Sequence, residues 1–217
     1  MEKYISKKEK ASYGFAAVGS YMVAGITQSY LMYFFTDILI IPSAFVMMLM
    51  IVARAWDALN DPMMGVIVDR TSTKYGKMRP YVLIGSFLML VTTIVLFMPL
   101  TGAPTMFKMI FAAVSYIIFG MAYTLTDVPA MGLMSVATPN SDERASLLSF
   151  YVTVGSVGSL LPVGLLTIFQ SFIPEKYVYF AMSIFVGIIT SAAYLTLFKN
   201  SKERFSTHTE KIAVRDM

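Results

Sequence analysis

Long apolar stretches alternate with short polar segments along the whole of this chain. A helix needs about 20 mostly apolar residues to cross a bilayer, and six stretches reach that length: about 11–36, 43–68, 81–100, 106–136, 145–172 and 177–198. A polar segment, residues 1–10, precedes them, and a charged tail, residues 199–217, follows. The pattern predicts an all-α, polytopic membrane protein with one bundle of six transmembrane helices over residues 11–198.

The composition agrees with a membrane protein. Hydrophobic residues make up 57% of the 217 residues and charged residues 14%, whereas soluble domains carry about a quarter charged residues. The chain has no cysteine, which excludes disulfides and thiolate metal sites. The first apolar stretch is as long as a membrane span, so we do not expect a cleavable signal peptide.

The distribution of lysine and arginine predicts the orientation in the membrane. Basic residues concentrate in cytoplasmic segments of membrane proteins, and here the polar segments on one side hold nearly all of them. We therefore expect both termini in the cytoplasm, in a plasma or inner membrane, and no nucleic-acid partner. The residues on the expected cytoplasmic side are Lys3, Lys7, Lys8, Lys10, Arg70, Lys74, Lys77, Arg79, Arg144, Lys199, Lys202, Arg204, Lys211 and Arg215, against Lys108 and Lys176 on the other.

Two carboxylates lie inside the second apolar stretch. An ionised side chain at that depth costs about 3 kcal/mol on insertion scales. On a helix, positions i, i+3 and i+4 share one face, so Asp57, Asn60 and Asp61 converge. Their oxygens suit a small hard cation. The alternative is a structural ion pair with Arg54, although one arginine does not neutralise two aspartates.

Four short segments of the chain resemble a known transporter family. They are Ser12–Phe15 with Tyr30–Asp37, then Arg54–Gly65, then Tyr123–Pro129. These segments are similar to the first, second and fourth helices of the glycoside-pentoside-hexuronide:cation symporters, the melibiose permease-like family of the major facilitator superfamily. The similarity extends over residues 12–198. It implies the N-terminal six-helix half of a transporter whose C-terminal six-helix half is missing here.

The resemblance also implies a coupling-ion site. Asp57, Asn60, Asp61 and Thr124 match the residues that bind sodium, lithium or a proton in the family. Two neighbouring carboxylates are also able to hold a proton, so sodium and proton coupling both stay open. If the ion is sodium, these four residues form the metal site. No organic cofactor is expected.

Asp127 is a third carboxylate within an apolar stretch, and the resemblance implies that it contacts a sugar. A carboxylate accepts hydrogen bonds from neighbouring sugar hydroxyls. Tyr123 lies one helical turn earlier and is expected to line the same cavity. The alternative for Asp127 is an interhelical hydrogen bond with a serine or threonine.

The expected solute site departs from the melibiose permease pattern at four positions. Tyr21 stands where the relative has an aspartate, Ser20 replaces a lysine, Val152 an arginine, and Met131 a tryptophan. We count Tyr21 and Met131 among the substrate-binding candidates. These differences argue against a galactoside and leave another sugar, a uronic acid or a more apolar solute open.

The loop after the second apolar stretch resembles the major facilitator loop signature. Gly65, Asp69 and Arg70 are followed, after an insertion, by Gly76-Lys77-Met78-Arg79. The resemblance implies a gating loop whose charge pairs stabilise one of two conformations. The alternative is a basic loop that only sets the orientation in the membrane.

Together these features predict cation:solute symport of a sugar or sugar-like solute. No nucleophile–base pair or set of metal-binding histidines is present, so an enzyme is not expected. Two alternatives remain: symport of an amphiphilic or lipid-like solute, and a non-transporting half-transporter fragment or subunit. The expected partners are the solute, the coupling cation, membrane lipid and the missing half.

Overall fold

A computed structural model describes residues 4–205 of the chain. Parts of the predicted terminal segments, residues 1–3 and 206–217, lie outside the described residues. The described part is helical and contains no strand. Its elements, in chain order, are α1 (Lys7–Tyr33), the π-helix η1 (Phe34–Ile38), α2 (Ser43–Arg70), α3 (Arg79–Leu96), α4 (Thr105–Ala137), α5 (Ser141–Gln170) and α6 (Glu175–Asn200). The predicted all-α, six-helix architecture is confirmed.

Five of the helices, α2 to α6, are long and apolar enough to cross a membrane. α1 is not one of these five helices, although the sequence predicted a membrane span over residues 11–36. α1 has 27 residues, about 40 Å of helix, but it begins with Lys7-Lys8-Glu9-Lys10 and carries several polar residues along its length. It packs against both α5 and α6, so much of its surface contacts protein.

Helix ends differ from the expected boundaries by a few residues, for local reasons. α1 begins before residue 11 because the Ser6 side chain accepts a hydrogen bond from the Glu9 N–H and so caps the helix. Asn140 caps α5 in the same way, through Asp142 and Glu143. The π-helix after α1 was not predicted, since a single wide turn leaves no periodic signal in the sequence.

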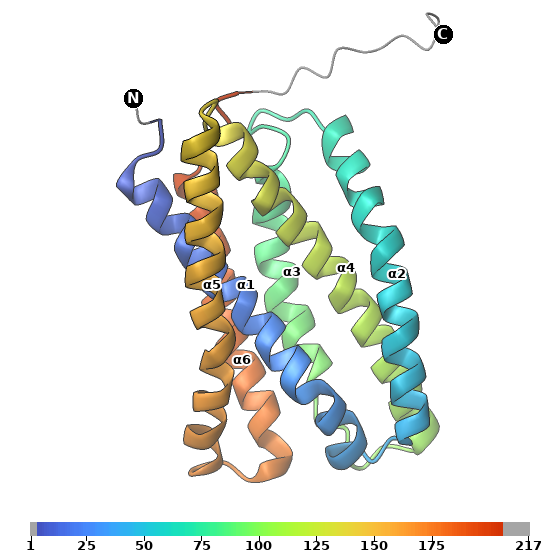
Figure 1. Ribbon diagram of the computed structural model, residues 1–217. Helices are drawn as coiled ribbons and strands as arrows, with labels where there is room; N and C mark the ends of the chain where they lie inside the picture. The colour runs from blue at the N-terminus through green and yellow to red at the C-terminus, as the bar shows by residue number, and fades with distance from the viewer. Residues whose placement is uncertain (1–3, 206–217) are drawn as a thin grey trace, which may run out of the picture.

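The bundle is more compact on one side than on the other. α1 packs against α5 and α6, and α3 packs against α4 and α6, whereas α2 packs mainly against α4 and lies at the edge of the bundle (Figure 1). Glycines allow α1 and α5 to approach closely: a Cβ at Gly158 would lie 2.8 Å from the Val18 carbonyl oxygen, and one at Gly25 would lie 2.6 Å from that of Ser159. Asp57 and Asp61 of α2 line a space between α1, α2 and α4.

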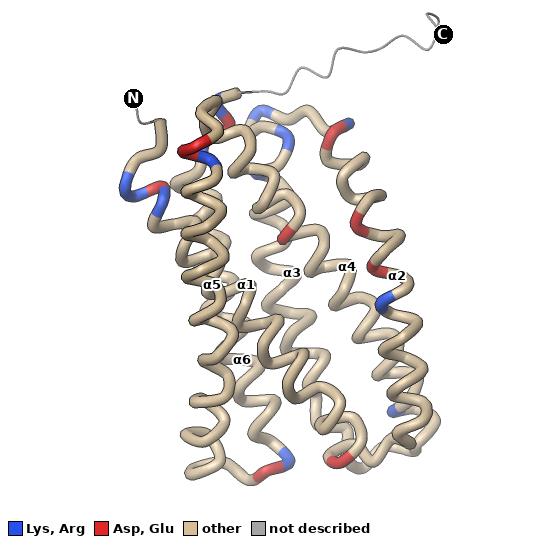
Figure 2. Tube along the Cα trace, viewed as in Figure 1, with Lys and Arg blue, Asp and Glu red and all other residues tan. Residues whose placement is uncertain are grey.

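We call the end of the bundle where α1 begins and α6 ends the terminal end. Most lysines and arginines lie there (Figure 2). Arg204, just after α6, forms an ion pair with the buried Glu9 of α1 at 2.7 Å, and this contact raises the pKa of Arg204. The backbone N–H groups of Arg204 and Phe205 donate to the Val136 carbonyl at the end of α4. The residues after α6 therefore hold the ends of three helices together.

Candidate functional site

A cavity of about 200 Å³ opens between α1, α2 and α4. Asp57 and Asp61 reach it from α2, and Thr124 reaches it from α4. The Thr124 hydroxyl donates a hydrogen bond to Asp61 Oδ1 at 2.8 Å. We name this space the aspartate cavity, after Asp57 and Asp61. It brings together three of the four residues expected to bind the coupling ion.

Helix geometry and a glycine shape this cavity. Asp57 and Asp61 are four residues apart on α2, so their side chains lie on the same face. Opposite them, Gly120 of α4 has no side chain, and a Cβ there would lie 3.2 Å from Asp57 Oδ1. The glycine therefore leaves room beside the carboxylate for a small ligand.

Arg54 and Asn60 occupy different environments. Arg54 lines the aspartate cavity with the two carboxylates, but it forms no ion pair with either of them. Among the described residues, the ion pair is Arg204–Glu9. Asn60 is absent from the described residues that line this cavity, and its Nδ2 is buried without a hydrogen-bond partner among them. The fourth expected ligand is therefore not part of the wall of this cavity.

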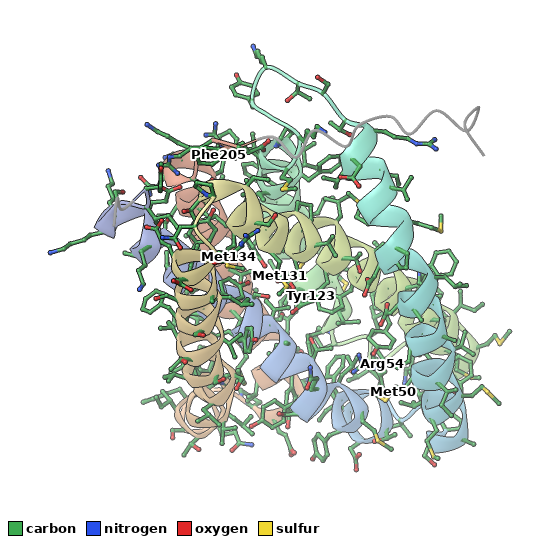
Figure 3. The ribbon with its side chains drawn as sticks, turned by 45° about the horizontal axis from the view of Figure 1, so that its top comes forward. Met50, Arg54, Tyr123, Met131, Met134 and Phe205 are labelled. Atoms are coloured by element: carbon green, nitrogen blue, oxygen red, sulfur yellow. The ribbon has the colours of Figure 1, made fainter. Side chains whose placement is uncertain are left out.

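A second cavity, of about 390 Å³, lies between α1, α4 and α5. All four substrate-binding candidates line it: Tyr21 from α1, and Tyr123, Asp127 and Met131 from α4. We name it the tyrosine cavity, after Tyr21, Tyr123 and Tyr151. Figure 3 shows Met131 and Tyr123 following one another along α4, with Arg54 beyond them on α2.

Asp127 is held by hydroxyl groups from three other helices. Its Oδ1 accepts hydrogen bonds from Ser20 of α1 at 2.7 Å, Tyr194 of α6 at 3.2 Å and Tyr151 of α5 at 3.4 Å. The interhelical bond to a serine considered from the sequence is therefore present. Asp127 also lines the tyrosine cavity, so the two interpretations of this residue are compatible.

The hydroxyl of Tyr123 extends this hydrogen-bond chain. Ser20 Oγ and Tyr123 Oη are 3.1 Å apart. Because Ser20 uses its only hydroxyl hydrogen on Asp127, Tyr123 is the donor in this pair. The order is thus Tyr123 to Ser20 to Asp127. The sequence indicated Ser20 only as a replaced lysine and gave no signal for Tyr151 or Tyr194, which reach Asp127 from other helices.

The expected gating residues Gly76, Lys77 and Arg79 lie around the carboxylate of Glu203, which the sequence analysis did not single out. Gly76 has a φ of +105°, and the backbone N–H groups of Lys77, Met78 and Arg79 donate to the Glu203 carboxylate at 2.8, 2.9 and 3.0 Å. Arg79 also donates to the Phe198 carbonyl at 2.7 Å.

The remaining gating candidates lie on α2. Asp69 and Arg70 end this helix, and Asp69 lines a pocket with Glu203. Neither residue forms an ion pair among the described residues. Gly65 has open space around it. A gating role for these residues remains a prediction.

Comparisons with known proteins agree on one family. The chain matches the family described as MFS/sugar transport protein over residues 12–216. It is 34% identical over 208 residues to the uncharacterized symporter YjmB of Bacillus subtilis, covering 94% of this chain and 45% of that protein. It is 31% identical to the putative glycoside/cation symporter YagG of Escherichia coli, covering 93% and 44%. It is 28% identical to the isoprimeverose transporter of Lactiplantibacillus pentosus, covering 95% and 44%.

The matched proteins are longer than this chain. The 217 residues span about 45% of the length of these relatives. Two of these relatives are named as symporters and one as a transporter, and two of the names include a substrate: glycosides for the putative symporter YagG, and isoprimeverose.

Proposed function

The chain belongs to the MFS/sugar transport protein family, and on that basis we propose that it is the N-terminal six-helix half of a cation:sugar symporter. Two of its relatives are named as symporters. The membership in a transporter family and the five apolar helices indicate a multi-pass membrane transporter rather than an enzyme. A C-terminal six-helix half is the partner that would complete the solute path, since transporters of this kind bind solute between two repeats near the bilayer midplane.

The observation that carries the proposal is the hydrogen bond from Thr124 to Asp61 inside the aspartate cavity. Two carboxylates and a hydroxyl from two helices face one small space. Asp57, Asp61 and Arg54 line the cavity together, so two carboxylates and one guanidinium leave one negative charge, which suits one monovalent cation. Sodium is the first candidate, and a proton is the second because carboxylates also bind protons.

The tyrosine cavity is the proposed solute site. Asp127 supplies a hydrogen-bond acceptor for sugar hydroxyls, Tyr123 and Tyr21 supply hydroxyls and ring faces, and Met131 supplies an apolar wall. No lysine or arginine is among the described residues that line this cavity. This half of the site therefore favours a neutral glycoside over a uronic acid.

We place the terminal end in the cytoplasm. The support is the concentration of lysine and arginine at that end, which is the usual feature of cytoplasmic segments (Figure 2).

Transport in proteoliposomes tests the proposal. The complete transporter that contains this chain should accumulate a labelled glycoside such as isoprimeverose under a sodium or proton gradient. Asp57→Cys and Asp61→Cys should each reduce gradient-driven uptake by about tenfold or more, because losing one partner of a buried charged contact costs about 2–5 kcal/mol.

Asp142→Asn is the matched control, since this carboxylate is exposed in the first turn of α5, away from both cavities. Undiminished ion coupling in both aspartate variants would contradict the cation site. Absence of any gradient-driven uptake by the unmodified transporter, across a panel of neutral glycosides and glucuronides, would contradict the symport itself.

A further inference from the structure

The aspartate cavity and the tyrosine cavity share part of their walls. Ala24, Gln28 and Tyr123 line both. A residue in this shared wall is within reach of a ligand on either side. The two proposed binding sites are therefore neighbours, and the side chains between them decide whether one ligand affects the other.

Gln28 is the residue of the shared wall whose polar side-chain atoms are available to a ligand. Ala24 has no polar side-chain atom, and the Tyr123 hydroxyl hydrogen is used on Ser20. The Gln28 side chain is exposed and forms no hydrogen bond with the described residues. Its amide has an oxygen that accepts and an NH₂ group that donates, so it is able to face a cation with one end and a solute hydroxyl with the other.

The backbone of α1 holds Gln28 in this position. Tyr21, Ala24 and Gln28 recur at intervals of three and four residues, so they form one face of the helix. Gly25, on the neighbouring face, allows α1 to lie directly against α5, where even a Cβ would be 2.6 Å from the Ser159 carbonyl oxygen. Gln28 therefore projects from a rigid helix rather than from a loop.

We propose that Gln28 couples the two sites, and this proposal rests on the symport function proposed above. A cation in the aspartate cavity attracts the amide oxygen and orients the side chain. The NH₂ group is then directed at the solute and donates to a hydroxyl. When the aspartate cavity is empty, the amide rotates freely and solute binding must order it, which lowers solute affinity.

Trp56 supplies a direct measurement of this coupling. It is the only tryptophan of the chain and lines the aspartate cavity together with Gln28. The experiment uses the complete transporter in lipid nanodiscs, with any tryptophan outside these 217 residues replaced by phenylalanine. Sodium chloride is titrated against a choline chloride background, with and without isoprimeverose, a galactoside or a glucuronide, while Trp56 emission is followed. Titrations with lithium chloride and with acid are run in parallel.

In the unmodified protein, an accepted sugar should lower the midpoint of the cation titration by about fivefold or more, the usual size of coupling between linked sites. Gln28→Ala should bring the ratio of the midpoints measured without and with sugar close to one, and should also raise the midpoint for the cation alone, because the amide oxygen no longer attracts the cation. Two matched variants should keep the ratio. Thr27→Val alters a residue of the aspartate cavity whose hydroxyl bonds the Val23 carbonyl, and Ser159→Ala alters a residue of the tyrosine cavity.

The outcomes separate the two proposals. A sugar-dependent shift that survives Gln28→Ala, or that is lost equally in Thr27→Val and Ser159→Ala, would overturn the role of Gln28. If the unmodified protein shows no response of Trp56 to sodium, lithium or protons with any sugar, the proposed symport fails instead.

Discussion

At the scale of single residues, Asp127 has the most crowded polar environment in the bundle. Three hydroxyls converge on its Oδ1, from Ser20, Tyr151 and Tyr194, whereas its Oδ2 accepts no hydrogen bond from the described residues and is not among the buried unpaired atoms. One oxygen is thus occupied by the protein and the other is open to the tyrosine cavity. In the proposed solute site, the three hydroxyls would position Asp127 so that its other oxygen is able to accept a hydrogen bond from a solute.

Tyr194→Phe removes one of these donors without changing the shape of the side chain. Tyr194 is 1% exposed and donates to Asp127 at 3.2 Å. Hydrogen bonds to charged groups contribute about 1.5–3 kcal/mol, and this one is long, so we expect solute affinity to fall about five- to tenfold. Equilibrium binding of the labelled sugar measures the effect.

The matched control lies on the same helix. Tyr179 is buried among the rings of Tyr30, Tyr33 and Phe34, and its hydroxyl bonds to none of the described residues. Tyr179→Phe should therefore leave solute affinity unchanged. Equal affinities of the two variants would show that Tyr194 does not position Asp127 for the solute.

At the scale of elements, the start of α3 depends on a residue more than a hundred positions later in the chain. The first N–H groups of a helix lack partners within the helix. Glu203 accepts three hydrogen bonds from this region and brings a negative charge to the positive end of the helix dipole. The close contact requires Gly76, where a Cβ would collide with the Glu203 carboxylate.

Glu203→Gln should destabilise this end of the bundle by about 1–2 kcal/mol, the usual value of a helix cap, because the charge-assisted bonds become neutral ones. The melting temperature of the purified protein should fall, and trypsin should cleave faster after Lys74 and Lys77 in the adjoining loop.

Lys202→Ala is the control for this change, because the Lys202 side chain is exposed and only its backbone N–H is hydrogen bonded, to Glu9. If both variants melt and are cleaved like the unmodified protein, Glu203 is not a cap that stabilises α3.

At the scale of the whole molecule, the charge distribution and the apolar helices define an orientation that labelling is able to test. The chain has no cysteine, so a single introduced cysteine reports one position. Ser72 lies in the loop at the terminal end, and Gly102 lies in the loop between α3 and α4 at the opposite end, with nothing within 4 Å of a Cβ. Both positions are exposed.

In intact cells, a membrane-impermeant maleimide should label Gly102→Cys at least about tenfold faster than Ser72→Cys, because the proposed topology puts the basic terminal end in the cytoplasm. Permeabilised cells should label both to a similar extent, which controls for reactivity. The reverse order in intact cells would invert the proposed topology.

Features that depend on neighbours along the chain were predictable from the sequence. The helices follow from long apolar stretches, and the convergence of Asp57 and Asp61 follows from the helical repeat. Tyr21, Asp127 and Met131 were grouped through the resemblance, and Tyr123 was added because it lies one helical turn before Asp127. All four line one cavity. Asn60 was grouped with the two aspartates by the helical repeat and Thr124 was added through the resemblance; Thr124 lines the aspartate cavity, whereas Asn60 is not among the residues of its wall.

Features that depend on how the helices pack were decided by the tertiary structure alone. Ser20, Tyr151 and Tyr194 meet at Asp127 although they lie on three different helices, and Glu203 reaches α3 from beyond α6. Gln28 lies between two cavities only because α1 packs against α5 and passes close to α4. Apolar membrane helices are hydrophobic on nearly every face, so their sequences do not reveal which face meets which neighbour. That choice follows from close packing at glycines and from interhelical hydrogen bonds, which exist only in the folded bundle.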